Sequence, residues 1–88
     1  MLIRNPDILS TAFENGGAVL FNISDRRAYL LNKTAWQIFL LSGGENTAED
    51  TAAIIAKMYG TDKETLRNDM EKILTQFVKK GILLHEKR

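Results

Sequence analysis

Few residues in this sequence could do acid–base, nucleophilic or metal chemistry, and their spacing does not bring them together. The chain has no cysteine, and its single histidine, His85, stands in the charged last segment. No Cys/His pair can form, and no Ser/His/Asp triad is indicated. Carboxylates stand close in sequence at Glu49 with Asp50 and at Asp69 with Glu71. Helical neighbours one or two positions apart do not face each other, so we expect no enzyme activity, no metal site and no cofactor.

The size and composition of the chain predict one soluble globular domain. It has 88 residues, of which 44% are hydrophobic and 26% charged, and we expect a single domain over residues 1–88 with a core over about 8–84. The start has no apolar signal segment, and no run approaches the roughly 18–20 apolar residues of a membrane span. Because cysteine is also absent, we expect a cytoplasmic protein. The net charge of +1 gives no electrostatic footprint for nucleic acid.

The first third of the sequence predicts an antiparallel sheet. We expect three strands, over about residues 8–13, 18–23 and 27–31. Between the first two strands, the segment ENGG at residues 14–17 tolerates the positive φ angles of a tight hairpin turn. Residues 24–26 make the second turn. Strand alternation predicts that Ala28 and Leu30 face one side of the third strand, and that its remaining residues face the other.

The rest of the chain changes to the period of helices. Three helices are predicted, from a cap at Asn32 to about Ser42, from Thr47 to Gly60 and from Thr61 to Gly81. Both later starts have the spacing of a capping box, with an acid three residues on. The expected buried stripes are Ala35, Trp36, Ile38 and Phe39, then Thr51, Ile54, Ile55, Met58 and Tyr59, then Leu66, Met70, Ile73, Leu74 and Phe77. A small sheet followed by three helices predicts an α+β, winged helix-turn-helix-like fold.

This fold leaves two kinds of binding function open. In a winged-helix DNA-binding regulator, the third helix would contact DNA, but its outward face mixes Lys63, Arg67 and Lys72 with acids that repel phosphate. The other function is peptide capture, because an edge strand offers unpaired N–H and C=O groups to an extended peptide. The strand at 27–31 leads directly into the helices, so helices could wall a groove beside it. Arg26 and Arg27 could equally serve only to blunt an exposed edge.

A dispersed set of residues carries a resemblance to a known family. It comprises Tyr29, Leu31, Asn32 and Thr34, then Phe39 one turn further on, a second helix that starts with a Thr, and Asp69 in a third helix that ends at Gly81. In order and spacing this set resembles the PqqD family over about residues 8–84. Members of that family are leader-peptide-binding proteins, also called RiPP recognition elements.

The resemblance implies binding of the N-terminal leader of a ribosomally made precursor peptide. The leader would add antiparallel to the third strand, lie against the third helix and be presented to a modifying enzyme. That partner is a radical SAM protein in pyrroloquinoline quinone synthesis, and a protease or other tailoring enzyme in lasso and related systems. The implied peptide-binding residues are Arg27, Ala28, Tyr29, Leu30, Leu31, Leu66, Arg67, Asp69, Met70, Lys72, Ile73 and Phe77. No cofactor, nucleic acid or membrane is implied, and the chain would be a monomer or an edge-paired dimer.

The sequence departs from the quinone-pathway members in several places. Residues 22–25 stand where those members tend to carry a Pro-acid stretch, Ala35 and Trp36 replace small residues, and Phe39 replaces a Trp. An adaptor for another modified peptide is therefore at least as consistent with the sequence as the quinone pathway.

Each implied site residue also has an ordinary structural interpretation. The apolar residues of the third helix would form the stripe of any core-facing helix, and Tyr29 would be a half-buried sheet aromatic. Arg27, Arg67 and Lys72 would be solvated charges, although cations at a groove would favour encounter with an acidic leader.

Overall fold

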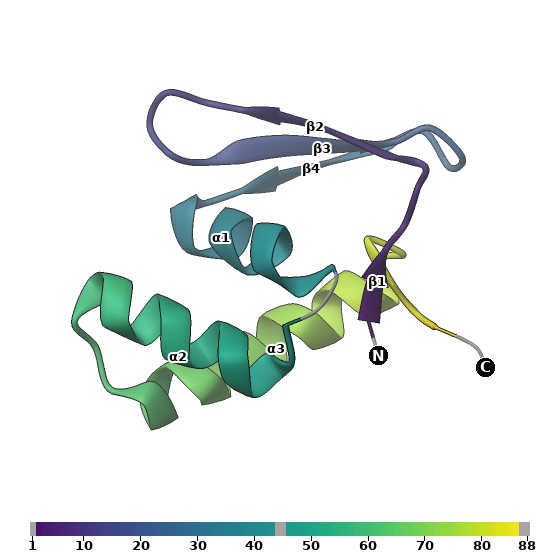
Figure 1. Cartoon of the computed structure of the whole chain (residues 1–88). Coiled ribbons are helices and arrows are strands. Elements are labelled where there is room, and N and C mark those ends of the chain that lie inside the picture. The colour runs from purple at the N-terminus through teal and green to yellow at the C-terminus, as the bar shows by residue number, and fades with distance from the viewer. Residues whose placement is uncertain (1, 44–45, 87–88) are drawn as a thin grey trace.

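The computed structural model describes residues 2–43 and 46–86 and has a sheet layered on helices. Strands β2 (Ile8–Ala12), β3 (Ala18–Asn22) and β4 (Arg27–Leu31) form an antiparallel sheet in the order β2-β3-β4. Helices α1 (Lys33–Ser42), α2 (Ala48–Tyr59) and α3 (Lys63–Lys79) follow. The sheet covers α1, and α2 and α3 lie beyond α1 (Figure 1). The predicted order, three strands and then three helices, is confirmed.

Two short strands join the ends of the described chain. Strand β1 (Leu2–Arg4) pairs antiparallel with β5 (Leu83–His85), so that Leu2 lies opposite His85. Neither of these strands was predicted from the sequence. The pairing depends on a partner about 80 residues away, which no local pattern reveals. Leu83 is fully buried, so the pair closes one side of the core (Figure 1).

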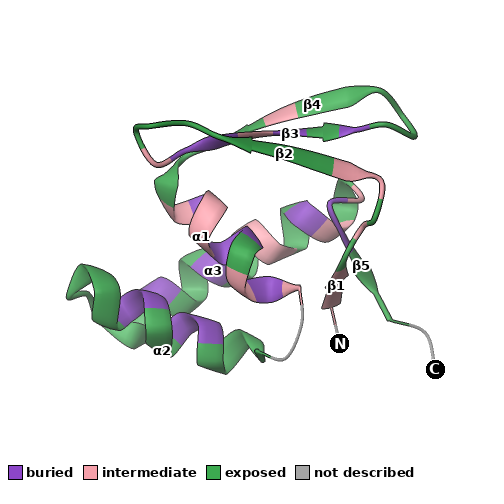
Figure 2. Cartoon of the chain, turned by 45° about the horizontal axis from the view of Figure 1, so that its top comes forward, coloured by how far each residue is buried: buried purple, intermediate pink, exposed green. Residues whose placement is uncertain are grey.

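The two faces of the three-stranded sheet differ in burial. Ala18, Leu20 and Asn22 of β3 point inward and are buried. On β4, Tyr29 and Leu31 pack against the core, which confirms the predicted alternation. The opposite face is covered by no other described element and is largely exposed (Figure 2).

Local hydrogen bonds set the turns and the first two helix starts. Gly16 has a φ of 95°, which glycine adopts without a steric penalty. Asn32 caps α1 by accepting a hydrogen bond from the Ala35 amide at 2.8 Å. Thr47 and Asp50 form the predicted capping box at the start of α2. These signals depend on residues only a few positions apart, and they were correctly predicted.

The start of α3 differs from its prediction. Asp62, rather than Thr61, is the N-cap, and its carboxylate accepts a hydrogen bond from the Thr65 amide at 3.2 Å. Thr61 with Glu64 has the right spacing, but Asp is an equally good cap and lies one residue closer to the helix. The Thr61 amide instead donates to the carbonyl oxygen of Ala56, which ties it to the end of α2.

The core lies between the sheet and the three helices. Its buried cluster comprises Leu20, Ala35, Ile38, Phe39, Ala52, Ile55, Ala56, Leu66, Met70, Phe77, Ile82 and Leu83. The rings of Phe39 and Phe77 meet edge to face at 6.3 Å, and Trp36 stacks on Phe39 at 5.7 Å. Trp36 is only partly buried, at the margin of the cluster.

The buried face of α2 is rotated from its predicted position. Thr51 and Ile55 are buried as expected, but the alanines at 52 and 56 complete this face. Ile54, Met58 and Tyr59 are exposed instead. A pattern weighted by large apolar residues does not detect a buried face that two small alanine side chains complete. No helix in the described residues is long and apolar enough to cross a membrane.

Candidate functional site

The candidate site begins at the edge of the sheet. Strand β4 pairs with β3 on one side only, and no described strand lies on its other side. An edge of this kind presents N–H and C=O groups that can pair with an added strand. The strand is preceded by Arg26, whose φ of 61° lies in the left-handed region and ends the turn from β3.

A cleft of about 250 Å³ opens between this edge and α3. It is lined by Tyr29, Leu30, Leu31, Ala35, Lys72, Ile73, Gln76, Phe77, Lys80 and Ile82. Most of these groups are apolar, and the polar ones are two lysines and one glutamine. Among the residues that the structure describes, no carboxylate lines the cleft. It therefore combines an apolar interior with a cationic margin.

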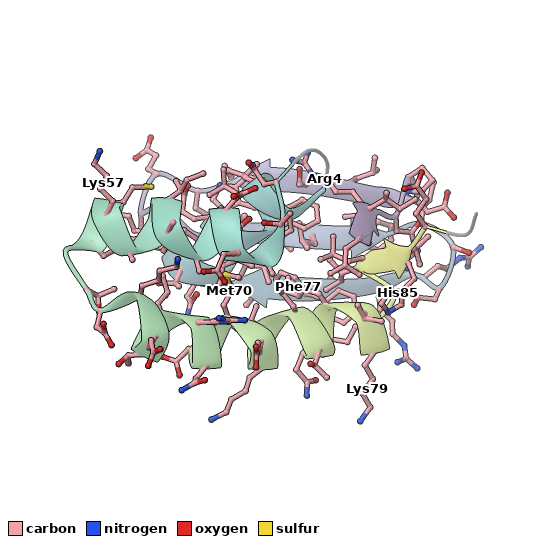
Figure 3. The ribbon with its side chains drawn as sticks, turned by 60° about the horizontal axis from the view of Figure 1, so that its bottom comes forward. Arg4, Lys57, Met70, Phe77, Lys79 and His85 are labelled. Carbon is pink, nitrogen blue, oxygen red and sulfur yellow. The ribbon has the colours of Figure 1, made fainter. Side chains whose placement is uncertain are left out.

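Helical spacing explains which residues α3 contributes. Ile73, Gln76, Phe77 and Lys80 follow one another at i, i+3, i+4 and i+7 and share a face of the helix. Phe77 is almost completely buried and points into the molecule, whereas the neighbouring Lys79 points away (Figure 3). The apolar members thus form the base of the cleft, and the polar members lie at its margin.

Tyr29 and Lys80 close one end of the cleft. The Nζ atom of Lys80 lies 5.5 Å from the centre of the Tyr29 ring, within the range of a cation–π interaction. The Tyr29 hydroxyl lies 3.5 Å from the carbonyl oxygen of Lys80. The edge strand and the end of α3 are therefore connected at this point.

The structure divides the twelve predicted site residues into two groups. Six of them line the cleft: Tyr29, Leu30, Leu31, Lys72, Ile73 and Phe77. Six do not: Arg27 and Ala28 are exposed on β4, Leu66 and Met70 are buried in the core, Arg67 forms ion pairs with acids, and Asp69 is exposed on α3. The sequence pattern could not distinguish the α3 residues that are buried in the core from those that line the cleft, because both groups include apolar side chains.

Four lining residues were not predicted: Ala35, Gln76, Lys80 and Ile82. Gln76 and Lys80 lie three and seven positions after Ile73, so following the helical face onward from Ile73 would have found them. Ala35 and Ile82 come from other elements, and no local pattern relates them to β4.

The charged groups on the opposite side of α3 neutralise one another. The Nζ atom of Lys63 lies 2.5 Å from Glu49, and Arg67 lies 3.2 Å from Glu49 and 3.8 Å from Glu71. The hydrogen bond from Lys63 and its charge, with the charge of Arg67, hold the pKa of the Glu49 carboxyl below its ordinary value. This network joins α2 to α3 and lies apart from the lining of the cleft.

A second hollow, of about 420 Å³, lies against another face of α3. It is lined by Leu2, Leu74, Thr75, Val78, Lys79 and His85. His85 is the only imidazole in the chain, and no group of three metal-ligating side chains occurs within residues 2–43 and 46–86. This hollow includes no residue of the three-stranded sheet, and so lacks the open edge of β4.

Comparison with known proteins identifies the family. Two solved structures share the fold: TbiB1 in complex with the TbiA(beta) leader peptide (TM-score 0.85, 17% identity, 98% of this chain and 99% of that chain) and lasso peptide synthetase B1 complexed with the leader peptide (TM-score 0.83, 20% identity, 96% and 98%). No curated protein matches the chain. The family model described as coenzyme PQQ synthesis protein D (PqqD) matches residues 17–83, and the chain therefore belongs to the PqqD family.

Proposed function

We propose that this protein binds the leader segment of a ribosomally synthesised precursor peptide and presents it to a modifying enzyme. The leader adds as an extended strand to β4 and places side chains in the cleft against α3. The observation that carries this proposal is that the open edge of β4 lies directly beside an apolar cleft. Membership of the PqqD family supports it, as do two similar structures that hold leader peptides.

Both parts of the site are needed for useful affinity. An added strand of about five residues forms several backbone hydrogen bonds, each contributing about 0.5–1.5 kcal/mol net. Ordering a disordered segment costs about 2–5 kcal/mol or more, which offsets much of that gain. The surplus must come from apolar leader side chains that fill the space between Tyr29 or Leu31 and Ile73 or Phe77.

The margin of the cleft favours an acidic leader. Lys72 and Lys80 line the cleft, and neither makes an ion pair within the part of the chain that the structure describes. Cations that are not neutralised attract an anionic peptide and speed its encounter with the site. Arg67 contributes less to this field, because Glu49 and Glu71 accompany it.

The protein acts by binding, and a separate modifying enzyme carries out the chemistry. The precursor belongs to the lasso or a related class of modified peptide. Both structural neighbours are proteins with leader peptides bound, one of them a lasso peptide synthetase component. Residues 22–25 and Phe39 depart from the pattern of the quinone pathway.

Titration with a synthetic leader tests the proposal. The probe is the N-terminal segment of the precursor encoded beside this gene, added to the ¹⁵N-labelled full chain. Amide shifts should concentrate at residues 27–31 and on the α3 positions 72–80, and calorimetry should give a saturable 1:1 isotherm. Shifts spread over the whole surface, or none at saturating peptide, would contradict the proposal. Salt-sensitive shifts with duplex DNA instead would identify the alternative, a DNA-binding regulator.

A further inference from the structure

The outer face of the three-stranded sheet is an uncharged, exposed apolar surface. Two rows of residues cross it, Leu9–Phe21–Ala28 and Thr11–Val19–Leu30, in which each residue lies opposite the next across the strands. Four of its large side chains are well exposed: Leu30 (79%), Leu9 (57%), Ile23 (50%) and Phe21 (38%). No residue in these rows is charged. We call the two rows together with Ile23 the outer sheet face (Figure 2).

This face is large for a chain of 88 residues. Taking about 150–250 Å² for a fully exposed large side chain, the exposed fractions of these four side chains correspond to about 340–560 Å². The largest apolar patch of a typical monomer is about 300–600 Å² and is often functional. The outer sheet face falls within that range.

We propose that the outer sheet face packs against the same face of a second copy of this chain. In an isologous contact both copies use the same surface. Each residue of the face therefore lies against the same residue of the second copy, or against a neighbour of that residue. In such a contact, a charged face would bring like charges of the two copies together. The residues of the outer sheet face are uncharged, so two copies can pack against each other without that repulsion. Two sheets packed face to face form a sandwich with their strands aligned within about 30° and a separation of about 10 Å.

The area buried suits a weak dimer. Two outer sheet faces together bury about 700–1,100 Å², which is below the roughly 1,200 Å² of stable specific interfaces and in the range of weak, transient ones. Leu30 belongs to this face and also to the lining of the cleft, but the backbone N–H and C=O groups of the β4 edge point along the sheet and not out of its face. This arrangement differs from an edge-paired dimer, in which β4 itself would be covered. The inference therefore does not depend on leader binding.

Sedimentation of the full chain from about 1 µM to about 1 mM, which spans weak to moderate affinity, tests the proposal. The mass should rise from that of a monomer to that of a dimer. Leu9→Asp, on the strand furthest from the cleft, should raise the dimer dissociation constant at least about tenfold. Ile23→Asp should do the same, so a folding defect in one variant leaves the other as a test. Met58→Asp, at an exposed apolar position on α2, is the matched control and should leave the dimer intact.

A second measurement distinguishes the possible occupants. In the dimer, methyl groups of Leu9, Val19 and Ile23 should be protected from a soluble paramagnetic agent, while Met58 stays accessible. A chain that remains monomeric at every concentration would overturn the proposal and leave the face to a different protein. A dimer that survives both Asp variants, or that dissociates when leader peptide binds, would overturn it in favour of pairing through an edge. Leader binding should be the same in Leu9→Asp as in the unmodified chain.

Discussion

The ring of Tyr29 lies 5.5 Å from the Nζ atom of Lys80, and the Tyr29 hydroxyl lies 3.5 Å from the Lys80 carbonyl oxygen. The two residues are 51 positions apart, and they join the edge strand to the end of α3. A donor–acceptor distance of 3.5 Å is too long for a strong hydrogen bond. The Tyr29 ring and the Lys80 cation beside it therefore contribute more to the contact between β4 and the end of α3 than the Tyr29 hydroxyl does.

Truncation of Tyr29 should weaken leader binding. Tyr29→Ala removes the aromatic wall and should raise the leader dissociation constant about tenfold or more, a change of about 1.4 kcal/mol or more. Tyr29→Phe keeps the ring and should stay within about twofold of the unmodified chain. Calorimetry with the leader peptide measures both.

The matched control for Tyr29 is Tyr59→Ala. The Nζ atom of Lys33 lies 5.9 Å from the centre of the Tyr59 ring. This is a lysine–tyrosine contact like that of Lys80 with Tyr29, but neither residue lines the cleft. This variant should bind leader normally. Equal weakening by Tyr29→Ala and Tyr59→Ala would mean that the effect is one of stability and not of contact.

A charge placed in the cleft should abolish binding while the domain still folds. Ile73 is partly buried and lines the cleft, so Ile73→Asp puts a carboxylate where an apolar leader side chain would pack, and desolvating that charge is costly. Ile54→Asp makes the same change at an exposed position of α2 and should leave binding intact. The measurements are calorimetry for binding and circular dichroism for folding. Unchanged affinity in Ile73→Asp would remove Ile73 from the site.

Reversal of the two cleft lysines should slow association. In Lys72→Glu/Lys80→Glu the margin of the cleft becomes acidic, so the association rate for an acidic leader should fall and should lose its dependence on ionic strength. Stopped-flow fluorescence at low and high salt measures this. Lys79 points away from the body of the molecule (Figure 3) and is not among the residues that line the cleft, so Lys79→Glu is the control and should change the rate little. A rate unaffected by the double reversal would show that the leader's charge is not recognised here.

In β5, the side chain of Leu83 should contribute to the free energy of unfolding and that of Leu84 should not. Leu83 is fully buried and Leu84 is exposed, although they are adjacent and of the same type. Leu83→Ala should lower the free energy of unfolding by about 2–5 kcal/mol, whereas Leu84→Ala should lower it by no more than about 0.5 kcal/mol. Urea denaturation measures both changes. Equal effects would mean that β5 does not pack on the core in solution.

The ion pairs of Glu49 should give a small stabilisation that depends on pH. The pKa of Glu49 in the folded protein is lowered from its ordinary value of 4.5, so the folded state favours the ionised carboxylate. The contribution is therefore present above the ordinary pKa and is lost as the pH falls through the lowered one. Glu49→Gln should lower the melting temperature slightly at pH 7, and this difference should shrink as the pH falls through the lowered pKa of the folded state.

Salt provides the control for Glu49. These side chains are about half exposed, so screening at high ionic strength should remove most of the difference at pH 7. A difference in melting temperature that is independent of both pH and salt would indicate lost packing rather than lost charge.

Residues close together in the chain were sufficient to predict much of this protein. Asn32 caps α1 because its side chain reaches an amide three residues on. The alternation along β3 predicted that Leu20 and Phe21 face opposite sides of the sheet, and the structure buries Leu20 and exposes Phe21. The position of β4 directly before the helices indicated where an added strand would find a wall.

Only the tertiary structure decided which apolar side chains of α2 and α3 are buried in the core and which stay at the surface. Leu66 and Met70 belong to the core, whereas Ile73 lines the cleft, and all three lie on one apolar stripe of α3. The pairing of β1 with β5 and the contact of Tyr29 with Lys80 likewise join segments far apart in the chain. Local periodicity shows which side chains can be buried. Which of them are buried depends on the neighbours that the fold places against them.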